Sequence, residues 1–138
     1  MSDASEDVAR WIADIASGLT YGKTVRIGPP QKPSTNTALA NAIPEKCVFV
    51  LPGRGATSEA WGGGGGVSKP MVQIWVRGTR NKYEEARDLA FHIFDSVDKQ
   101  PPSGYFEARS QYSQPELIQQ DEVGCFEFLI NLDLRKQV

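Results

Sequence analysis

The chain has 138 residues and a formal net charge of −2, with 40% hydrophobic and 23% charged residues. This composition is typical of a folded soluble protein, and we expect a single domain over residues 1–138. Lys and Arg form no block along the chain. A protein that holds nucleic acid through clustered positive charge is therefore disfavoured.

Targeting and membrane signals are missing from the sequence. No apolar run approaches the roughly 18 residues that a membrane-spanning helix needs. The acidic start, MSDASEDVAR, is the opposite of a signal peptide. We therefore expect a protein made in the cytoplasm, in which the widely separated Cys47 and Cys125 are two buried thiols.

The first predicted element is a helix within SEDVARWIADIASG. Its apolar residues recur at helical spacing and share one face; they are Val8, Trp11, Ile12 and Ile15. Ser5 is the predicted N-cap, and Gly18 is the predicted C-terminal stop.

Residues 19–46 predict a long irregular crossing. Pro29, Pro30 and Pro33 interrupt it, so at most one short strand is expected, near residues 24–27. Leu39 and Ile43 give it some means of folding back onto a core. Connections of this length inside a compact domain are often functional.

Two strands are expected next, at Cys47–Pro52 and Met71–Arg77. The first is β-branched and aromatic. The second alternates between two sets of side chains, one on each face of the strand. One face carries Val72, Ile74 and Val76, and the other carries Met71, Gln73, Trp75 and Arg77.

A second helix and three strands complete the predicted fold. The helix spans about residues 81–97, opened by a capping box of Asn81 and Glu84, and strands follow at residues 105–110, 115–120 and 125–134. The fold class is α+β, with two helices packed on one face of a mostly antiparallel sheet. A long hairpin loop and the long N-terminal crossing loop complete it.

Five consecutive glycines lie between the two central strands, in WGGGGGVSKPM. A phosphate-binding loop would lead into a helix, whereas Val67-Ser68-Lys69-Pro70 leads into a strand. We therefore interpret residues 53–70 as a flexible hairpin connection whose tip carries Trp61. Trp61 either anchors an interface or folds back onto its own domain.

Catalytic and metal-binding patterns are weak. His92 is the only histidine, and it falls off the apolar stripe of the second helix, so we expect a surface residue. One histidine and two distant cysteines do not make a metal site. We expect no enzyme, no catalytic residue, no cofactor and no metal.

A surplus of apolar side chains on the second sheet face indicates an association surface. The candidate interface residues are Trp61, Met71, Trp75, Arg77 and Leu129. In the alternative interpretation, the crossing of residues 19–46 covers this face of the sheet.

Three runs carry a family resemblance: AIPEKCVFVLPGRG, KPMVQIWVRGTRNKYEEARDLAFHIFDSV and EVGCFEFLINLDL. Together they resemble the minor capsid or tail terminator proteins of long-tailed bacteriophages. The matching positions form a Pro-x-Val-Gln-x-x-Val-Arg strand, a Tyr-x-x-Ala-Arg-x-Leu-Ala helix and a closing strand. They are Pro70, Val72, Gln73, Val76, Arg77, Tyr83, Ala86, Arg87, Leu89, Ala90 and Gly124 onward. The chain departs from the family at the glycine run and at Thr79-Arg80-Asn81.

The resemblance implies a structural virion protein of the tail or neck, made in the bacterial host cytoplasm. Such subunits form a ring, typically of six, at the head-proximal end of the tail tube, where the ring stops tube growth. The implied partners are further copies of the chain, the tail tube protein and the head connector or stopper. No membrane and no sequence-specific nucleic acid is implied, because the genome only passes through the lumen.

Other interpretations stay open on the sequence alone. A head-completion or stopper protein of the neck shares the small size and α+β content. A small enzyme with an unrecognised site would need a ligand pocket. A bacterial adaptor domain unconnected to phage is the third alternative.

Overall fold

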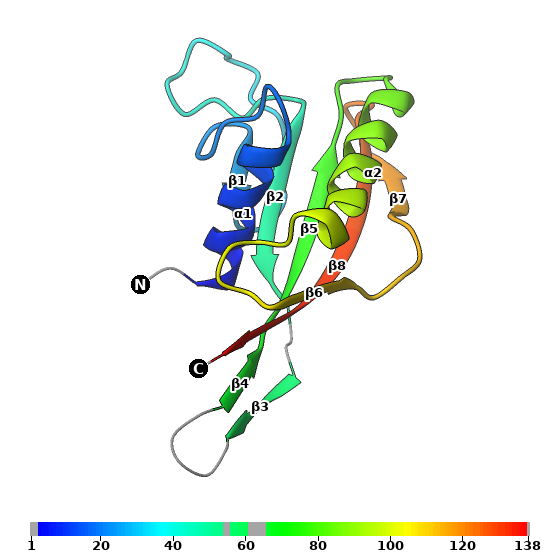
Figure 1. The fold of residues 1–138 in the computed structure, drawn as a ribbon. Coiled ribbons are helices and arrows are strands. Elements are labelled where there is room, and N and C mark those ends of the chain that lie inside the picture. The colour runs from blue at the N-terminus through cyan, green and yellow to red at the C-terminus, as the bar shows by residue number, and fades with distance from the viewer. Residues whose placement is uncertain (1–2, 54–55, 61–65, 138) are drawn as a thin grey trace.

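A twisted sheet with two helices is the framework of the chain in the computed structural model, which describes residues 3–53, 56–60 and 66–137 (Figure 1). The elements in chain order are α1 (Ala4–Ile15), β1 (Val25–Ile27), β2 (Cys47–Pro52), β3 (Ala56–Ala60), β4 (Gly66–Lys69), β5 (Met71–Arg77), α2 (Tyr83–Lys99), β6 (Glu107–Ser110), β7 (Glu116–Gln120) and β8 (Phe126–Gln137).

The 12-residue strand β8 organises the sheet. It pairs with β5 on one side, with β6 and β7 on the other, and with β4 at its C-terminal end. The strand order is β1-β2-β5-β8-β4-β3, and every pairing except that of β1 with β2 is antiparallel. Both helices lie on the same face of the sheet (Figure 1). The predicted α+β class and the one-sided helix packing are confirmed.

The core lies between the helices and that face of the sheet. Alternate residues of β5 and β8 point into it, as the period of two predicts, and they are 2% exposed or less: Val72, Ile74, Val76, Ile130, Leu132 and Leu134. They meet Val8 and Ile12 of α1 and Ala90 and Ile93 of α2, all fully buried. Burying each large aliphatic side chain stabilises the fold by about 1.5–3 kcal/mol. This is enough to fix the register of the two longest paired strands.

Both helices begin differently from the prediction. Asp3, rather than Ser5, is the N-cap of α1, and its Oδ1 accepts a hydrogen bond from the Glu6 N–H at 2.8 Å. The Asn81–Glu84 capping box does not form, because α2 begins at Tyr83 without a side-chain cap and Asn81 has a φ of 60°. The Asn81 side chain instead accepts a hydrogen bond from the amide of Gln120 at 3.2 Å.

The connection between β2 and β5 is more ordered than the sequence predicted. Residues on either side of the glycine run form the paired strands β3 and β4, and β4 is held by the end of β8 through Ser68↔Lys136 and Val67↔Gln137. We call β3 and β4 the ribbon; it extends beyond the body of the molecule (Figure 1). Trp61, a predicted interface residue, lies outside the described residues. Gly66, the last glycine of the run, begins β4, and β5 follows, so a strand and not a helix comes after the run, as predicted.

Several smaller expectations have definite outcomes. Cys47 and Cys125 are free and buried, as predicted. Leu39 is 54% exposed and does not fold back onto the core. Among the described residues, no helix has the length and apolar character needed to cross a bilayer.

Candidate interface surfaces

The sheet face opposite the helices carries four of the five predicted interface residues, and three of them are partly exposed. Met71 and Trp75 lie on β5 and Leu129 lies on β8, and Trp75 is the direct register partner of Leu129. All three side chains are partly exposed, in contrast to the buried residues between them. The Trp75 indole N–H donates to Oε1 of Gln73 at 3.4 Å, which satisfies its one donor without help from a partner. We call Met71, Trp75 and Leu129 the sheet-face patch.

Arg77 was predicted as an interface residue, and the structure corrects this. Its side chain is only 2% exposed. Its guanidinium donates to the carbonyls of Glu45 and Pro44, each at 2.8 Å, and also to the carbonyl of Gln31. Arg77 is therefore an internal anchor for the crossing, which brings its backbone carbonyls over the end of β5.

The crossing thus covers one end of the sheet face and leaves the other uncovered. On the neighbouring strand β2, Cys47 is the register partner of Arg77 and Phe49 is the partner of Trp75, so both lie on this sheet face. They are 0% and 1% exposed. The Arg77 guanidinium carbon lies 5.1 Å from the centre of the Phe49 ring, a cation–π distance. The alternative in which the crossing covers this face holds at the Arg77 end, and the sheet-face patch lies in the part that stays partly exposed.

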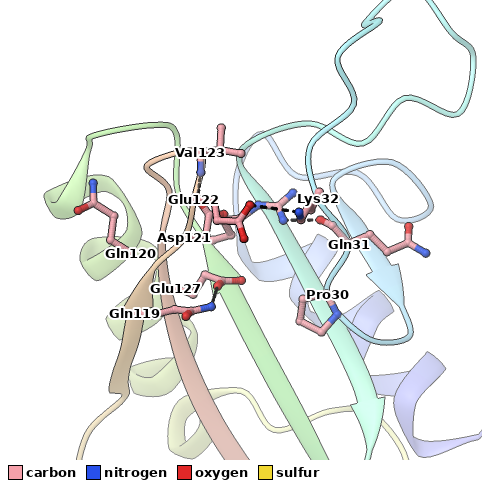
Figure 2. A pocket seen from close by; sticks show the side chains of 10 residues that line it. Pro30, Gln31, Lys32, Gln119, Gln120, Asp121, Glu122, Val123 and Glu127 are labelled. Atoms are coloured by element: carbon pink, nitrogen blue, oxygen red, sulfur yellow. Dashed lines mark hydrogen bonds and ion pairs between the residues drawn. The ribbon is translucent and has the colours of Figure 1, made fainter.

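A pocket of about 320 Å³ lies where the crossing approaches the β7–β8 turn (Figure 2). Its rim is joined by an ion pair between Lys32 Nζ and Glu122 Oε2, at 3.3 Å, with both side chains largely exposed. At its base, the Gln119 amide donates to Oε1 of the buried Glu127 at 2.8 Å. No local pattern indicates this pocket, because the residues that line it come from segments about 90 positions apart.

The loop beside the pocket is held by Asp121. Its Oδ1 accepts backbone N–H groups from Val123, Gly124 and Cys125, at 3.0, 2.9 and 2.9 Å. A carboxylate with three backbone donors is committed to the turn. The polar groups drawn in Figure 2 are therefore mostly paired with one another, an arrangement suited to holding loops together.

The two cysteines and the histidine, which could in principle take part in catalysis, also serve the fold. Burial, and secondly the nearby Asp121 carboxylate, raise the pKa of Cys125 to about 11, and burial raises the pKa of Cys47 as well. Both thiols are therefore protonated near neutral pH, which makes them poor nucleophiles. His92 is exposed, as predicted, and its Nε2 lies 2.7 Å from the Ile15 carbonyl, which links α2 to the end of α1. In the described part of the chain, no three metal-ligating side chains come together.

Comparison with known families decides the class of protein. A family model described as "Bacteriophage tail terminator protein" matches residues 5–138, nearly the whole chain. The chain belongs to the bacteriophage tail terminator family. The resemblance read from the strand and helix motifs is thus confirmed, and the protein is a structural component of a phage tail. A comparison with curated proteins finds no match.

Family membership makes the exposed surfaces of the protein its most relevant features. For a structural component of a phage tail, the surfaces at which it can contact other proteins are of most interest. The sheet-face patch was anticipated from strand alternation. The exposed apolar residues of the segment from Phe106 to Ile118 were missed, although the adjacent Leu117-Ile118 breaks the alternation of a half-buried strand.

Proposed function

We propose that this tail terminator assembles as a ring at the head-proximal end of the tail tube. There it ends tube polymerisation and offers the surface that the head connector or stopper binds. Six copies is the number that the resemblance implies. The proposal rests on the family match over residues 5–138. That match favours a terminator over the other neck components considered from the sequence.

The sheet-face patch is the structural observation that best supports an assembly role. It places an indole and an isobutyl group side by side, with a thioether farther along the same strand face, on a partly exposed part of the sheet face opposite the helices. Aromatic residues and Met are enriched in the cores of protein interfaces, and desolvated Trp side chains often contribute most of the binding energy. A terminator needs such surfaces, because its activity is binding.

The mechanism requires that the two faces of the ring bind different partners. A ring stops growth if one of its faces binds the last tube subunits while the other offers no site for a further tube subunit. Individual contacts between free subunits need only be weak, since the tube end presents several sites at once and the contacts then act together. The tube end would thus favour ring formation at concentrations where free subunits dissociate.

Tube length is the measurement that tests this function. Tube protein is allowed to polymerise with and without the terminator, and lengths are scored by negative-stain electron microscopy. We expect shorter tubes of narrow length distribution, each with additional density at one end. Mass photometry of the terminator alone, over a concentration series, reports ring formation in the same samples. Tubes that grow equally long at every ratio of terminator to tube protein would overturn the proposal.

A different neck component would give another result. A stopper binds an already terminated tail or the head connector, so it would leave the length distribution unchanged. Adding preformed, length-limited tails then separates the two functions, because a stopper would bind these tails although it has no effect on their growth.

A further inference from the structure

The outer side of β7 is an open sheet edge. Among the described residues, this strand pairs only with β8, and all five of its residues are exposed. It contains neither Pro nor Lys, two residues that commonly protect an edge strand from pairing with another chain. An edge of this kind offers a row of backbone donors and acceptors to an added strand.

Exposed apolar side chains are also frequent in the segment that contains β6 and β7. Of the seven large apolar residues exposed in the described part of the chain, four lie between residues 106 and 118: Phe106, Tyr112, Leu117 and Ile118. Their exposed fractions are 60%, 58%, 47% and 38%. More of the exposed large apolar residues therefore lie in this segment than in the rest of the described chain, and exposed apolar groups of this kind are typical of a contact site.

The ribbon supplies the second open edge. In the described residues, β3 pairs only with β4, and the ribbon extends away from the body (Figure 1). Two residue pairs hold β4 to β8, and the rest of the ribbon is two-stranded; an isolated two-stranded hairpin is only marginally stable in water. The other end of the main sheet is less available, since Thr20 and Gly22 already bond both outward backbone groups of Val25 in β1.

The two open edges are complementary in length and charge. Strands β3 and β7 each have five residues. Residues 116–122 carry three acidic groups and no basic group: Glu116, Asp121 and Glu122. Asp121 is held in its turn and Glu122 pairs with Lys32, so Glu116, on β7 itself, is the group that faces an added strand most directly. The ribbon with the adjoining residues 135–137 carries Lys69, Arg135 and Lys136 against Glu59. Arg135 already pairs with Glu107 at 3.3 Å, so Lys136 is the basic group on which the charge argument rests. Opposite charges steer such edges together and set their orientation.

We propose that the ribbon of one copy docks on the β7 edge of the next copy, with β3 continuing the sheet across the subunit boundary. The inference deepens the proposed function, on which it rests, by naming the contact between copies. Two different surfaces of one chain meet, so the contact is heterologous and closes into a ring when the rotation between copies fits. The sheet-face patch is then left for the tube or the head side.

Cross-linking between two cysteine variants tests this contact directly. Leu117→Cys places a thiol on β7, and Ser58→Cys places one at the register irregularity of β3. The native Cys47 and Cys125 are 0% exposed and do not compete in the folded protein. A flexible bismaleimide tolerates an unknown register between the strands. We expect a covalent dimer when the two variants are mixed, little dimer from either alone, and a ladder of oligomers from the double variant.

A matched control separates this contact from random collision. Asp88→Cys places an exposed thiol on α2, outside both edges, and mixing it with Ser58→Cys should give only the background level of dimer. Equal dimer yields with Leu117→Cys and with Asp88→Cys would overturn the inference. So would a wild type that stays monomeric in mass photometry with tube protein present. The tube-length assay tests the proposed function independently of the cross-link. If the protein shortens tubes normally but the cross-link does not form, this contact is wrong and the proposed function is retained.

Charge reversal gives a second, non-covalent test. Glu116→Lys should raise the concentration at which oligomers form by about fivefold, the effect of weakening one exposed charged contact by about 1 kcal/mol. Lys136→Glu in the same chain should recover most of the loss. Asp88→Lys makes the same change in net charge away from both edges and should have no effect. Identical shifts for Glu116→Lys and Asp88→Lys would contradict the contact.

Discussion

Arg77 illustrates how a single charged side chain can belong to the fold. Its guanidinium donates to backbone carbonyls of the crossing at Gln31, Pro44 and Glu45, and the residue is 2% exposed. Lysine would keep the charge but lose the planar fork that reaches several carbonyls at once. We expect Arg77→Lys to destabilise the protein by about 2–4 kcal/mol, because buried carbonyls lose charged donors.

Urea unfolding followed by circular dichroism measures this loss. The matched control is Arg87→Lys on α2, where the arginine is 42% exposed and pairs with the neighbouring Asp88. That change should cost less than about 0.5 kcal/mol. Equal midpoints for the two variants would show that the carbonyl contacts of Arg77 contribute little.

The buried thiol of Cys125 predicts a loss of stability at alkaline pH. Burial and then Asp121 raise its pKa from 9.0 to about 11, so the folded protein holds this proton more tightly than the unfolded chain. The associated stability is fully present below pH 9 and is lost as the pH rises towards 11. Burial also raises the pKa values of Cys47 and Tyr105, which act in the same direction.

The comparison that isolates Cys125 is the slope of unfolding free energy against pH. Wild type should lose stability between pH 9 and 11 more steeply than Cys125→Ala, which keeps the other two groups. Parallel curves for the two proteins would remove Cys125 as a cause.

At the scale of elements, Gly78 governs the junction between β5 and α2. A Cβ at this position would lie 2.8 Å from the Cβ of Ala86 and 2.9 Å from its backbone nitrogen. Ala86 is in the first part of α2, whose backbone cannot yield without moving the helix. Gly78→Ala should therefore lower stability by about 1–3 kcal/mol, the usual cost of overpacking.

Thermal unfolding, compared with Gly53→Ala, is the measurement for this junction. The nearest atoms to a Cβ at Gly53 belong to the flexible Met71 side chain, at 3.1 Å, and can move aside. We expect a clearly lower melting temperature for Gly78→Ala only. Similar melting temperatures would mean that α2 shifts at little cost.

The elements also show what the sequence could and could not predict. Strands β5 and β8 and their faces followed from alternation, because one face is packed on helices and the period of two then decides which residues are buried. The caps at Ser5 and Asn81 were wrong, because several polar residues near each helix start could serve and tertiary contacts chose between them. The ribbon was missed because Ala-Thr-Ser-Glu-Ala has no apolar alternation, and its pairing depends on the far end of the chain.

The candidate interface residues also include some that the sequence could predict and some that it could not. Met71, Trp75 and Leu129 were found because their side of the strands is readable from the sequence. Arg77 lies on that side too, but whether a segment crosses above it is decided by the path of residues 28–46, which no local pattern encodes. The open edge at β7 was missed because being at an edge is a property of the whole sheet.

At the scale of the whole molecule, some parts of the sheet are covered by other elements and some are not. Among the described residues, the helices cover one sheet face and the crossing covers one end of the other. The sheet-face patch is partly exposed, and β7 and β3 each pair on one side only. A ring subunit needs contacts along the ring and contacts along the tube axis. The proposed ribbon-to-edge contact supplies the first kind, which leaves the sheet-face patch for the second.

Trp75→Arg tests that assignment. Arginine keeps an aliphatic stem to cover the strand while placing a charge where a partner would have to desolvate it. We expect the variant to fold and to form oligomers at the wild-type concentration, but to need at least about tenfold more protein to limit tube length, which corresponds to a loss of about 1.4 kcal/mol. Leu39→Arg, at an exposed apolar position on the crossing, is the matched control and should limit tubes normally. If Trp75→Arg instead abolishes oligomers of the free protein, the patch lies between copies in the ring, and the axial contact must be sought on another face.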